Sequence, residues 1–261
     1  MPDFSTIQKI SFIGSGNLAT NLALGLQKAG LRIVEVFSPD KSHARQFANL
    51  INCTVADHLE SINTESDLYL IAVPDDAIED VGRSLPQFNG IAAHTSGISS
   101  IKSLASAKNH GVFYPLQTFT LRRKVDLAHV PFFIEGSDNH VINALKVLAG
   151  KLSDNVREIT SDQRKQLHLA AVFVSNFPNH LYSIAENILE EQGLGFDFLK
   201  PLIRETAAKV SSVSPASAQT GPARRNDRNT LEKHLEMLEQ YPEYRKLYQL
   251  ISEQIKKKYH E

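Results

Sequence analysis

A glycine-rich turn near the N-terminus constrains the fold of this chain more than any other feature. In KISFIGSGNLATNLALGLQKAG, Gly14, Gly16 and Ala19 form a GxGxxA pattern between an apolar run and a helix-periodic stretch. Gly14 permits a tight turn, Gly16 lets the backbone approach a pyrophosphate, and Ala19 allows close helix–strand packing. The start of that helix also favours phosphates through its dipole and free N–H groups. We expect the cofactor contacts to come from Gly14, Ser15, Gly16, Asn17 and Leu18; the alternative is a merely tight turn.

Residues 1–160 alternate short apolar runs with helix-periodic stretches, as parallel strands joined by crossover helices do. We expect seven strands, at residues 9–13, 32–37, 67–73, 90–95, 111–114, 131–134 and 156–159. Helices should start near Asn17, Lys41, Asp75, Ser99 and Asn139. The prediction is an α/β fold whose doubly wound, Rossmann-like sheet occupies residues 1–160.

The strand pattern disappears after residue 160, so residues 161–261 are predicted to form an all-helical domain for substrate binding and dimerisation. Its first helix should run from about Asp162 to Gln192, with a kink at Pro178 because proline removes an intrahelical hydrogen bond. This helix is apolar on more than one face, so its own domain or a second subunit must surround it.

The end of the second predicted strand indicates which cofactor is bound. An NAD-binding protein places a carboxylate about 20 residues beyond the glycine turn, where it binds the ribose 2′-hydroxyl. Here the chain reads VFSPDKSHAR, with Ser38 in that place and Lys41 following. Asp40 is an alternative acid, although Pro39 should turn it away. The sequence therefore favours NADP, with NAD as the alternative.

Two further turns should face the same crevice, because ligands of open α/β sheets bind beyond the carboxyl ends of the strands. One follows the LYLIAV run, and the other reads HTSG. We expect cofactor contacts from Val73, Pro74, Thr95 and Gly97. Ser96 should assist catalysis and His94 should contact the substrate. The alternative is an ordinary strand-to-helix turn in which His94 is a hydrogen-bonded structural residue.

The helical region contains the remaining candidate residues. His168 and Asn176 lie on adjoining turns of the first predicted helix, so both can face one cleft. Because histidines titrate near neutral pH, His168 is predicted to donate a proton and Asn176 to hold the substrate, unless both are core residues. In GPARRND, Arg225 is a candidate clamp for a carboxylate or phosphate; the alternative is an Arg–Asp pair that fixes the loop.

The composition argues against several classes of partner. A net charge of −1 gives no field that would attract nucleic acid or an anionic membrane. No run approaches the roughly 18 apolar residues of a membrane span, and the N-terminus lacks the features of a signal peptide. Cys53 is the single cysteine, so no disulfide or CxxC metal motif can form within the chain. We expect a cytoplasmic protein that binds a small-molecule substrate and no metal, nucleic acid or membrane.

Longer motifs carry a resemblance to known proteins. The GSGN turn resembles the cofactor-binding domain of pyrroline-5-carboxylate reductases and β-hydroxyacid dehydrogenase-like proteins. HTSG, YPLQTF, HLAAVFVSNF and GPARRND are similar to one family of predicted NADP oxidoreductases that have a helical C-terminal domain of unknown function. The resemblance covers nearly the whole chain. It implies a helical domain like the C-terminal domain of 6-phosphogluconate dehydrogenase, and a homodimer in which these domains pack together.

The wider superfamily carries a lysine, with an asparagine one turn later, on the first long helix of the second domain. Here His168 takes the place of the lysine, and Asn176 lies two turns further on. Our first hypothesis is an NADP-dependent reductase of a small carbonyl or imine, with His168, Asn176 and Ser96 as catalytic residues. The alternative is a non-catalytic dinucleotide-binding sensor or interaction protein, because fold alone does not establish chemistry.

Overall fold

The computed structural model describes residues 7–120 and 123–260. The chain divides into two compact units, Met1–Asn176 and Phe177–Glu261, and each is described by itself. The first unit includes the helix that follows residue 160; the domain boundary that we place at this residue stays a prediction. Residues 1–6, part of the N-terminus in which we expect no signal peptide, lie outside the described residues.

The first unit is built on one eight-stranded sheet with the order β3-β2-β1-β4-β5-β6-β7-β8. Its strands are β1 (Lys9–Ile13), β2 (Arg32–Phe37), β3 (Thr54–Val55), β4 (Leu68–Ile71), β5 (Ile91–His94), β6 (His110–Pro115), β7 (Phe132–Gly136) and β8 (Val156–Glu158). The strand order reverses between β1 and β4, and ligands of open α/β sheets bind at such a switch point. The predicted doubly wound, Rossmann-like fold is therefore confirmed.

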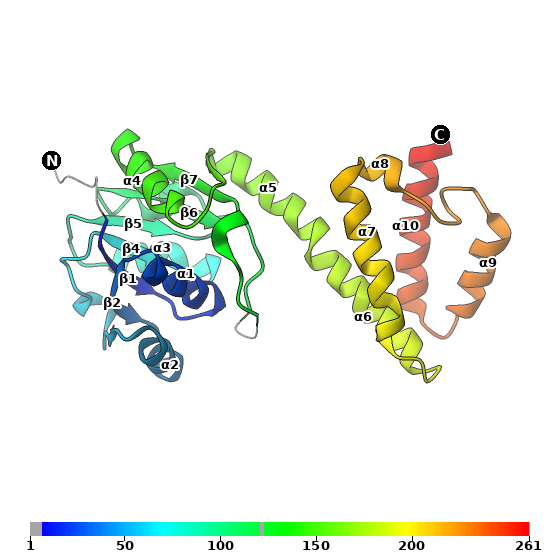
Figure 1. The fold of residues 1–261 in the computed structure, drawn as a ribbon, viewed down its shortest axis with the longest axis horizontal. Coiled ribbons are helices and arrows are strands. Elements are labelled where there is room, and N and C mark those ends of the chain that lie inside the picture. Colours follow the sequence, from blue (N-terminus) through cyan, green and yellow to red (C-terminus); the bar gives the residue numbers. More distant parts are fainter. Residues whose placement is uncertain (1–6, 121–122, 261) are drawn as a thin grey trace. The chain divides into compact units, whose positions relative to one another are not determined.

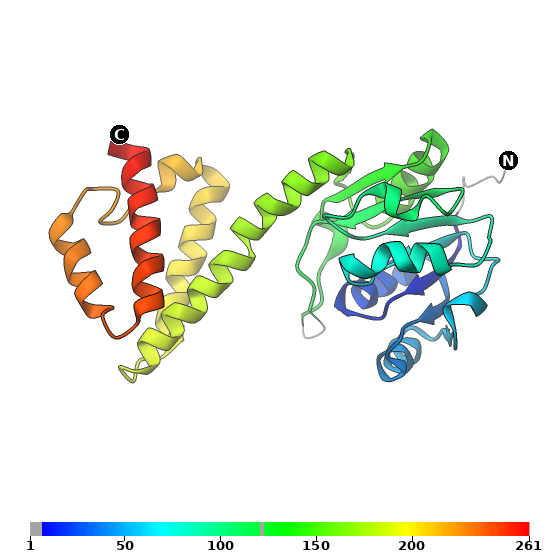
Figure 2. The ribbon, with the colours of Figure 1, turned by 180° about the vertical axis from the view of Figure 1, so that it is seen from behind.

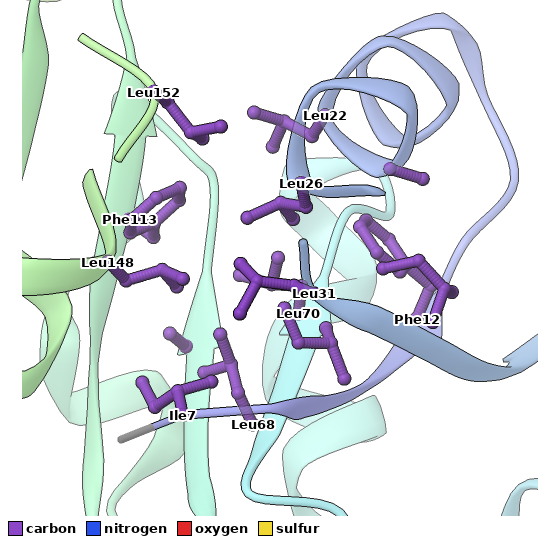
Figure 3. Close-up of a cluster of buried hydrophobic side chains, with 14 of the residues drawn as sticks. Ile7, Phe12, Leu22, Leu26, Leu31, Leu68, Leu70, Phe113, Leu148 and Leu152 are labelled. Atoms are coloured by element: carbon purple, nitrogen blue, oxygen red, sulfur yellow. The ribbon is translucent and has the colours of Figure 1, made fainter. Parts of the chain in front are cut away.

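Helices cover both faces of this sheet. One face packs against α1 (Asn17–Lys28), α2 (Lys41–Ile51) and α4 (Asn139–Gly150), and Figure 3 shows part of the core between them. The other face packs against α3 (Ile78–Ser84) and short 3₁₀ turns, as Figures 1 and 2 show from opposite sides. These turns are η1 (Leu59–Ser61), η2 (Asp75–Ala77) and η3 (Ile101–Leu104). A fourth turn, η4 (Leu127–His129), lies on the first face, where Leu127 joins the core. Buried residues alternate along β4: Leu68 and Leu70 join the first core, and Tyr69 and Ile71 join the second.

Three details of this unit differ from the prediction. The two-residue strand β3 was not expected, because so short a segment carries no periodicity. Strands β6 and β7 pair antiparallel, whereas crossover connections and parallel pairing were predicted. An antiparallel pair needs no crossover helix, and η4 is the one helical turn among the described residues that connect them. The helix expected near Ser99 is the short turn η3.

The long helix predicted from Asp162 to Gln192 is interrupted at Ser175. Helix α5 (Ser161–Val174) ends there, and α6 (Asn176–Glu190) begins directly afterwards. Pro178 has no N–H to offer the Val174 carbonyl, and its ring clashes with the carbonyl four residues earlier. The interruption therefore falls one turn before the proline, and the expected kink position at Pro178 was wrong.

The second unit is helical, as predicted. It contains α6, η5 (Phe196–Leu199), α7 (Lys200–Ser212), α8 (Pro215–Ala218), α9 (Arg228–Met237) and α10 (Pro242–His260), as labelled in Figure 1. Helices α6 and α10 are joined by a hydrogen bond of 3.0 Å from the Asn187 amide to the Tyr244 hydroxyl. Its described part buries few side chains, with Ala223 and Leu231 as its buried apolar residues. None of the helices in the described residues is long and apolar enough to span a membrane.

Candidate dinucleotide and substrate site

The glycine turn after β1 has the geometry that a pyrophosphate requires. Gly14 has a φ of +102°, and a Cβ there would lie 2.2 Å from the Ala72 carbonyl oxygen, so the turn requires glycine. A Cβ on Gly16 would meet no described atom within 4 Å. The first turn of α1 carries neither an acidic residue nor a side-chain cap. Open backbone at a helix N-terminus fits a bound phosphate. The remaining predicted contacts are partly or fully exposed: Ser15, Asn17 and Leu18.

The carboxylate nearest to the end of β2 is used within the protein. Asp40 caps α2, where it accepts hydrogen bonds from the backbone N–H groups of Ser42 at 2.9 Å and His43 at 3.0 Å. The bond from His43 is the main reason that the pKa of Asp40 is lowered. Its other oxygen lies 3.4 Å from the His43 ring. Asp40 is therefore a helix cap, which leaves the ribose 2′-hydroxyl without this acceptor.

The other predicted residues at this strand end are polar or basic. Ser38 is buried directly after β2. The Lys41 ammonium donates to the backbone carbonyls of Ala56, at 3.2 Å, and Asp57. Lys41 must give up these carbonyls to bind a 2′-phosphate. Arg45, one turn further along α2, is exposed and has no hydrogen bond or ion pair within the described part of the chain.

The turn after β5 is fixed by His94. The side chain is fully buried; Nδ1 accepts from the Ser96 N–H at 3.2 Å, and Nε2 lies 3.3 Å from the Ser100 carbonyl oxygen, to which it donates. Burial, aided by the charge of Arg164, lowers the pKa of His94 to about 3. A neutral histidine with both nitrogens bonded fits the structural alternative for this residue better than substrate contact.

Ser96 and its neighbours also stabilise this turn. The Ser96 hydroxyl accepts from the N–H groups of Ile98 at 3.1 Å and Ser99 at 2.9 Å. Thr95 donates its N–H to Ile71 of β4 at 3.1 Å. In this arrangement Ser96 has little capacity left for a substrate. Val73 and Pro74 follow β4 at the same carboxyl edge of the sheet.

The predicted proton donor, His168, reaches the same edge of the sheet. A Cβ on Gly97 would lie 2.4 Å from Nδ1 and 2.6 Å from Cγ of His168, so the imidazole packs directly on this glycine. The Tyr114 hydroxyl, at the end of β6, lies 3.0 Å from His168 Nδ1. Three segments far apart in the sequence thus meet at one imidazole.

A buried ion pair anchors the start of α5. Arg164, one turn before His168, is completely buried and pairs with Glu135 of β7. Its guanidinium also donates to the Ser99 carbonyl, and Glu135 accepts from the Ser161 N–H at 3.0 Å. A buried charge whose partner is removed costs about 3–5 kcal/mol, so this network fixes α5 against the sheet.

His168 and Asn176 line one groove of about 400 Å³, as the sequence predicts. Its other polar side chains include Tyr114, Gln117 and Thr118, and most of the remaining lining is aliphatic. No lysine, arginine, aspartate or glutamate is among its lining residues. The groove fits a small molecule with an apolar body and a group that hydrogen-bonds.

The predicted substrate clamp of the second unit lies in an exposed loop. Arg225 is exposed in the loop before α9, next to Asn226 with a φ of +55°. The predicted alternative, an Arg–Asp pair, is absent from the described ion pairs, because Asp227 instead caps α9 through Thr230 at 3.1 Å. Arg224 stacks on Tyr259, with 4.2 Å between the guanidinium carbon and the ring centre.

Sequence reasoning missed Tyr114, Arg164 and Glu135. Tyr114 lies in the quoted YPLQTF motif, and its place at the end of a predicted strand is the signal that would have found it. Arg164 lies in the polar stretch DQRKQ, which reads as the solvated start of a helix. Within the described residues, no group of three histidine, cysteine, aspartate or glutamate side chains is arranged to hold a metal ion.

The fold and the glycine turn define a dinucleotide-binding protein of the Rossmann class. Residues 9–99 match the family described as NADP oxidoreductase, coenzyme F420-dependent, and residues 130–255 match a domain of unknown function. A “putative NADP oxidoreductase” from Bacteroides fragilis is 40% identical, with 96% of this chain and 98% of that chain covered and a TM-score of 0.92. The chain belongs to this NADP oxidoreductase family.

More distant structures share the fold. Pyrroline-5-carboxylate reductase from Streptococcus pyogenes is 14% identical, covers 95% of this chain and 98% of its own, and has a TM-score of 0.61. A reductive aminase from Aspergillus terreus, in complex with NADPH and ethyl levulinate, is 13% identical with a TM-score of 0.74; the match covers 97% of this chain and 95% of that one. No protein of curated function matches the sequence.

Proposed function

We propose that this protein uses NADPH to reduce a small carbonyl or imine compound in the groove beside His168. The observation that carries the proposal is the meeting of His168, Gly97 and Tyr114 at the carboxyl edge of the sheet. A Rossmann-type sheet binds its ligands at this edge. A proton donor and a groove of about 400 Å³ lie beside it.

The residues of the first unit fit a dinucleotide. The turn at residues 14–18 would hold the pyrophosphate, since the space around Gly16 is open. Val73, Pro74, Thr95 and Gly97 would line the cofactor at the ends of β4 and β5. When bound, NADPH supplies a hydride.

The protein supplies a proton and an orientation. His168 holds a proton at the groove, and Asn176 offers an amide to the substrate oxygen or nitrogen. The aliphatic walls exclude water from the reacting group. The structural similarity to a reductive aminase and to pyrroline-5-carboxylate reductase supports the same class of reaction.

A substrate panel tests this function. In the forward assay, NADPH absorbance is followed while the purified protein is mixed with NADPH and one candidate compound at a time. The compounds are 2-keto acids, cyclic imines, and ketones with and without an amine. The reverse reaction is tested with NADP and 2-hydroxy acids. We expect at least one carbonyl or imine compound to oxidise NADPH. Tight NADPH binding without turnover on any compound would instead favour the non-catalytic sensor.

We predict that NADPH binds at least about tenfold more tightly than NADH. Asp40 is used as a helix cap, whereas Ser38, Lys41 and Arg45 offer donors to a 2′-phosphate. One hydrogen bond to a charged group contributes about 1.5–3 kcal/mol, which corresponds to more than a tenfold difference in dissociation constant. Calorimetric titration with both cofactors measures the ratio. Equal affinities would mean that Asp40 leaves its cap and binds the ribose.

We further propose that the protein is a cytoplasmic homodimer held together by its helical units. The second unit leaves large apolar side chains exposed, among them Phe198 at 73% and Leu202 at 62%. A unit of this size needs a buried core to be stable, and exposed apolar surface of this extent marks an interface. A second copy of the chain would cover it.

We predict that Leu202→Glu weakens this dimer, because it places a charge on the apolar surface of α7. Leu50→Glu is the matched control, since Leu50 is 57% exposed on α2 of the first unit. Sedimentation velocity of the two variants and the unaltered protein measures the assembly. A protein that sediments as a monomer, or a Leu202→Glu variant as dimeric as the control, would contradict the proposed interface.

A further inference from the structure

The imidazole of His168 is held on two sides. Gly97 packs against its Nδ1 and Cγ atoms, and any side chain at this glycine would displace the ring. Tyr114 approaches from the end of β6, with its hydroxyl 3.0 Å from Nδ1 and the two rings edge-on at 6.1 Å. The position of the ring is therefore set by contacts that the sequence analysis did not anticipate.

The Tyr114 hydroxyl can act as the donor in this hydrogen bond. Its ring is buried and packs near Phe133, with 6.4 Å between ring centres. Burial raises the pKa of Tyr114 to about 12, so the hydroxyl keeps its proton at neutral pH. His168 Nδ1 is its one hydrogen-bond partner in the described part of the chain. A phenol that keeps its proton can donate it to an Nδ1 that carries none.

With Tyr114 as the donor, His168 is held in one tautomer. A neutral imidazole has one N–H group and one acceptor nitrogen, so an Nδ1 that accepts leaves the proton on Nε2. Nε2 has no hydrogen-bond partner among the described residues, and His168 lines the groove. The N–H group available to a substrate is therefore the one on Nε2.

The surrounding charges act on Tyr114 in both directions. Arg164 of α5 lowers the pKa of the phenol, against the larger effect of burial, and Asp75 after β4 raises it. Glu135 of β7 is paired with Arg164, and His94 of β5 is neutral. Arg164 is thus a buried cation placed where it stabilises a phenolate at Tyr114.

We propose that Tyr114 and His168 form a proton relay in which Tyr114 is the proton source. As the hydride reaches the substrate carbon, the Nε2–H bond breaks and an O–H or N–H bond forms on the substrate. The Tyr114 O–H bond breaks at the same time, and its proton forms a new bond to Nδ1. The Nδ1–H bond then breaks as its proton returns to the phenolate, and Nε2 takes one proton from solvent water, which restores the Tyr114 hydroxyl and the Nε2–H tautomer and leaves hydroxide to the buffer. This inference rests on the proposed reductase function.

Nitrogen NMR tests the tautomer without a substrate. Histidines are labelled with ¹⁵N, and the signals of His168 are assigned by their loss in His168→Asn. At pH 8.5, where ordinary histidines are neutral, we expect a protonated Nε2 and an unprotonated Nδ1. In Tyr114→Phe we expect a mixture of tautomers. A protonated Nδ1 in the unaltered protein would overturn the relay, whether or not the protein is a reductase.

Kinetics test the proton source, with the active compound of the substrate panel. A relay from Tyr114 should keep kcat nearly constant between pH 6 and 8.5. Tyr114→Phe should lower kcat at pH 8.5 at least about tenfold, and its residual activity should fall as pH rises, because only an imidazolium can then donate. NADPH affinity should stay unchanged.

The second unit offers a matched control. Tyr248 of α10 makes a similar bond of 2.8 Å to Nδ1 of His234, outside the groove. Tyr248→Phe should therefore keep the rate and the pH profile of the unaltered protein. An unchanged kcat in Tyr114→Phe would overturn the relay. If that variant does not fold, the NMR spectrum and the pH profile of the unaltered protein still test the relay. A kcat of the unaltered protein that falls with rising pH would identify an imidazolium as the donor and would contradict the relay.

Discussion

Gly16→Val should abolish dinucleotide binding and leave the protein folded. A valine side chain would occupy the volume through which the pyrophosphate approaches the backbone. The free protein tolerates it, since a Cβ on Gly16 meets no described atom within 4 Å and the backbone is extended, with φ −74° and ψ −174°. We expect NADPH affinity to fall at least about a hundredfold, or 2.7 kcal/mol, by calorimetric titration.

Two other glycines provide the controls for this experiment. Gly150 also has open space around its Cβ position, but it lies at the end of α4, so Gly150→Val should bind NADPH normally. Gly14→Ala should instead lower the melting temperature, because its φ is +102° and its Cβ would clash with Ala72. Normal NADPH binding by Gly16→Val would place the phosphates elsewhere.

The sheet was predictable because its strands are apolar and evenly spaced. Residues such as Leu68 to Ile71 are buried on both faces of a parallel sheet, so they form the continuous apolar run that identifies a strand. The direction of β7 carries no such signal, because an apolar run looks alike in either direction. The break at Ser175 was displaced from Pro178 because proline disturbs the turn before it.

The candidate site was predictable only where a local motif marks it. The glycine turn has fixed spacing, and His168 is a polar residue in an apolar helix, so both could be found from the sequence. Tyr114 and His168 are 54 residues apart, and only tertiary structure brings them to 3.0 Å. The same holds for Arg164 and Glu135, whose pairing depends on where α5 begins relative to β7. Composition and periodicity do not record such distances.

The second large effect should follow from His168→Asn. Asparagine is smaller than histidine, so it fits above Gly97, and its amide can still bond to Tyr114. It cannot deliver a proton. General acid catalysis contributes about 10²- to 10⁴-fold, so turnover on the active compound of the panel should fall at least tenfold, which is about 1.4 kcal/mol in the barrier.

Binding measurements separate this chemical role from a structural one. NADPH affinity should stay nearly unchanged in His168→Asn, because the proposed cofactor contacts lie in the glycine turn and at the ends of β2, β4 and β5. His129→Asn is the matched control, since His129 is exposed in η4 and absent from the groove lining. It should keep full activity. If His168→Asn unfolds or precipitates with no separable loss of turnover, the histidine is a core residue. That result would favour the non-catalytic dinucleotide-binding protein over the reductase.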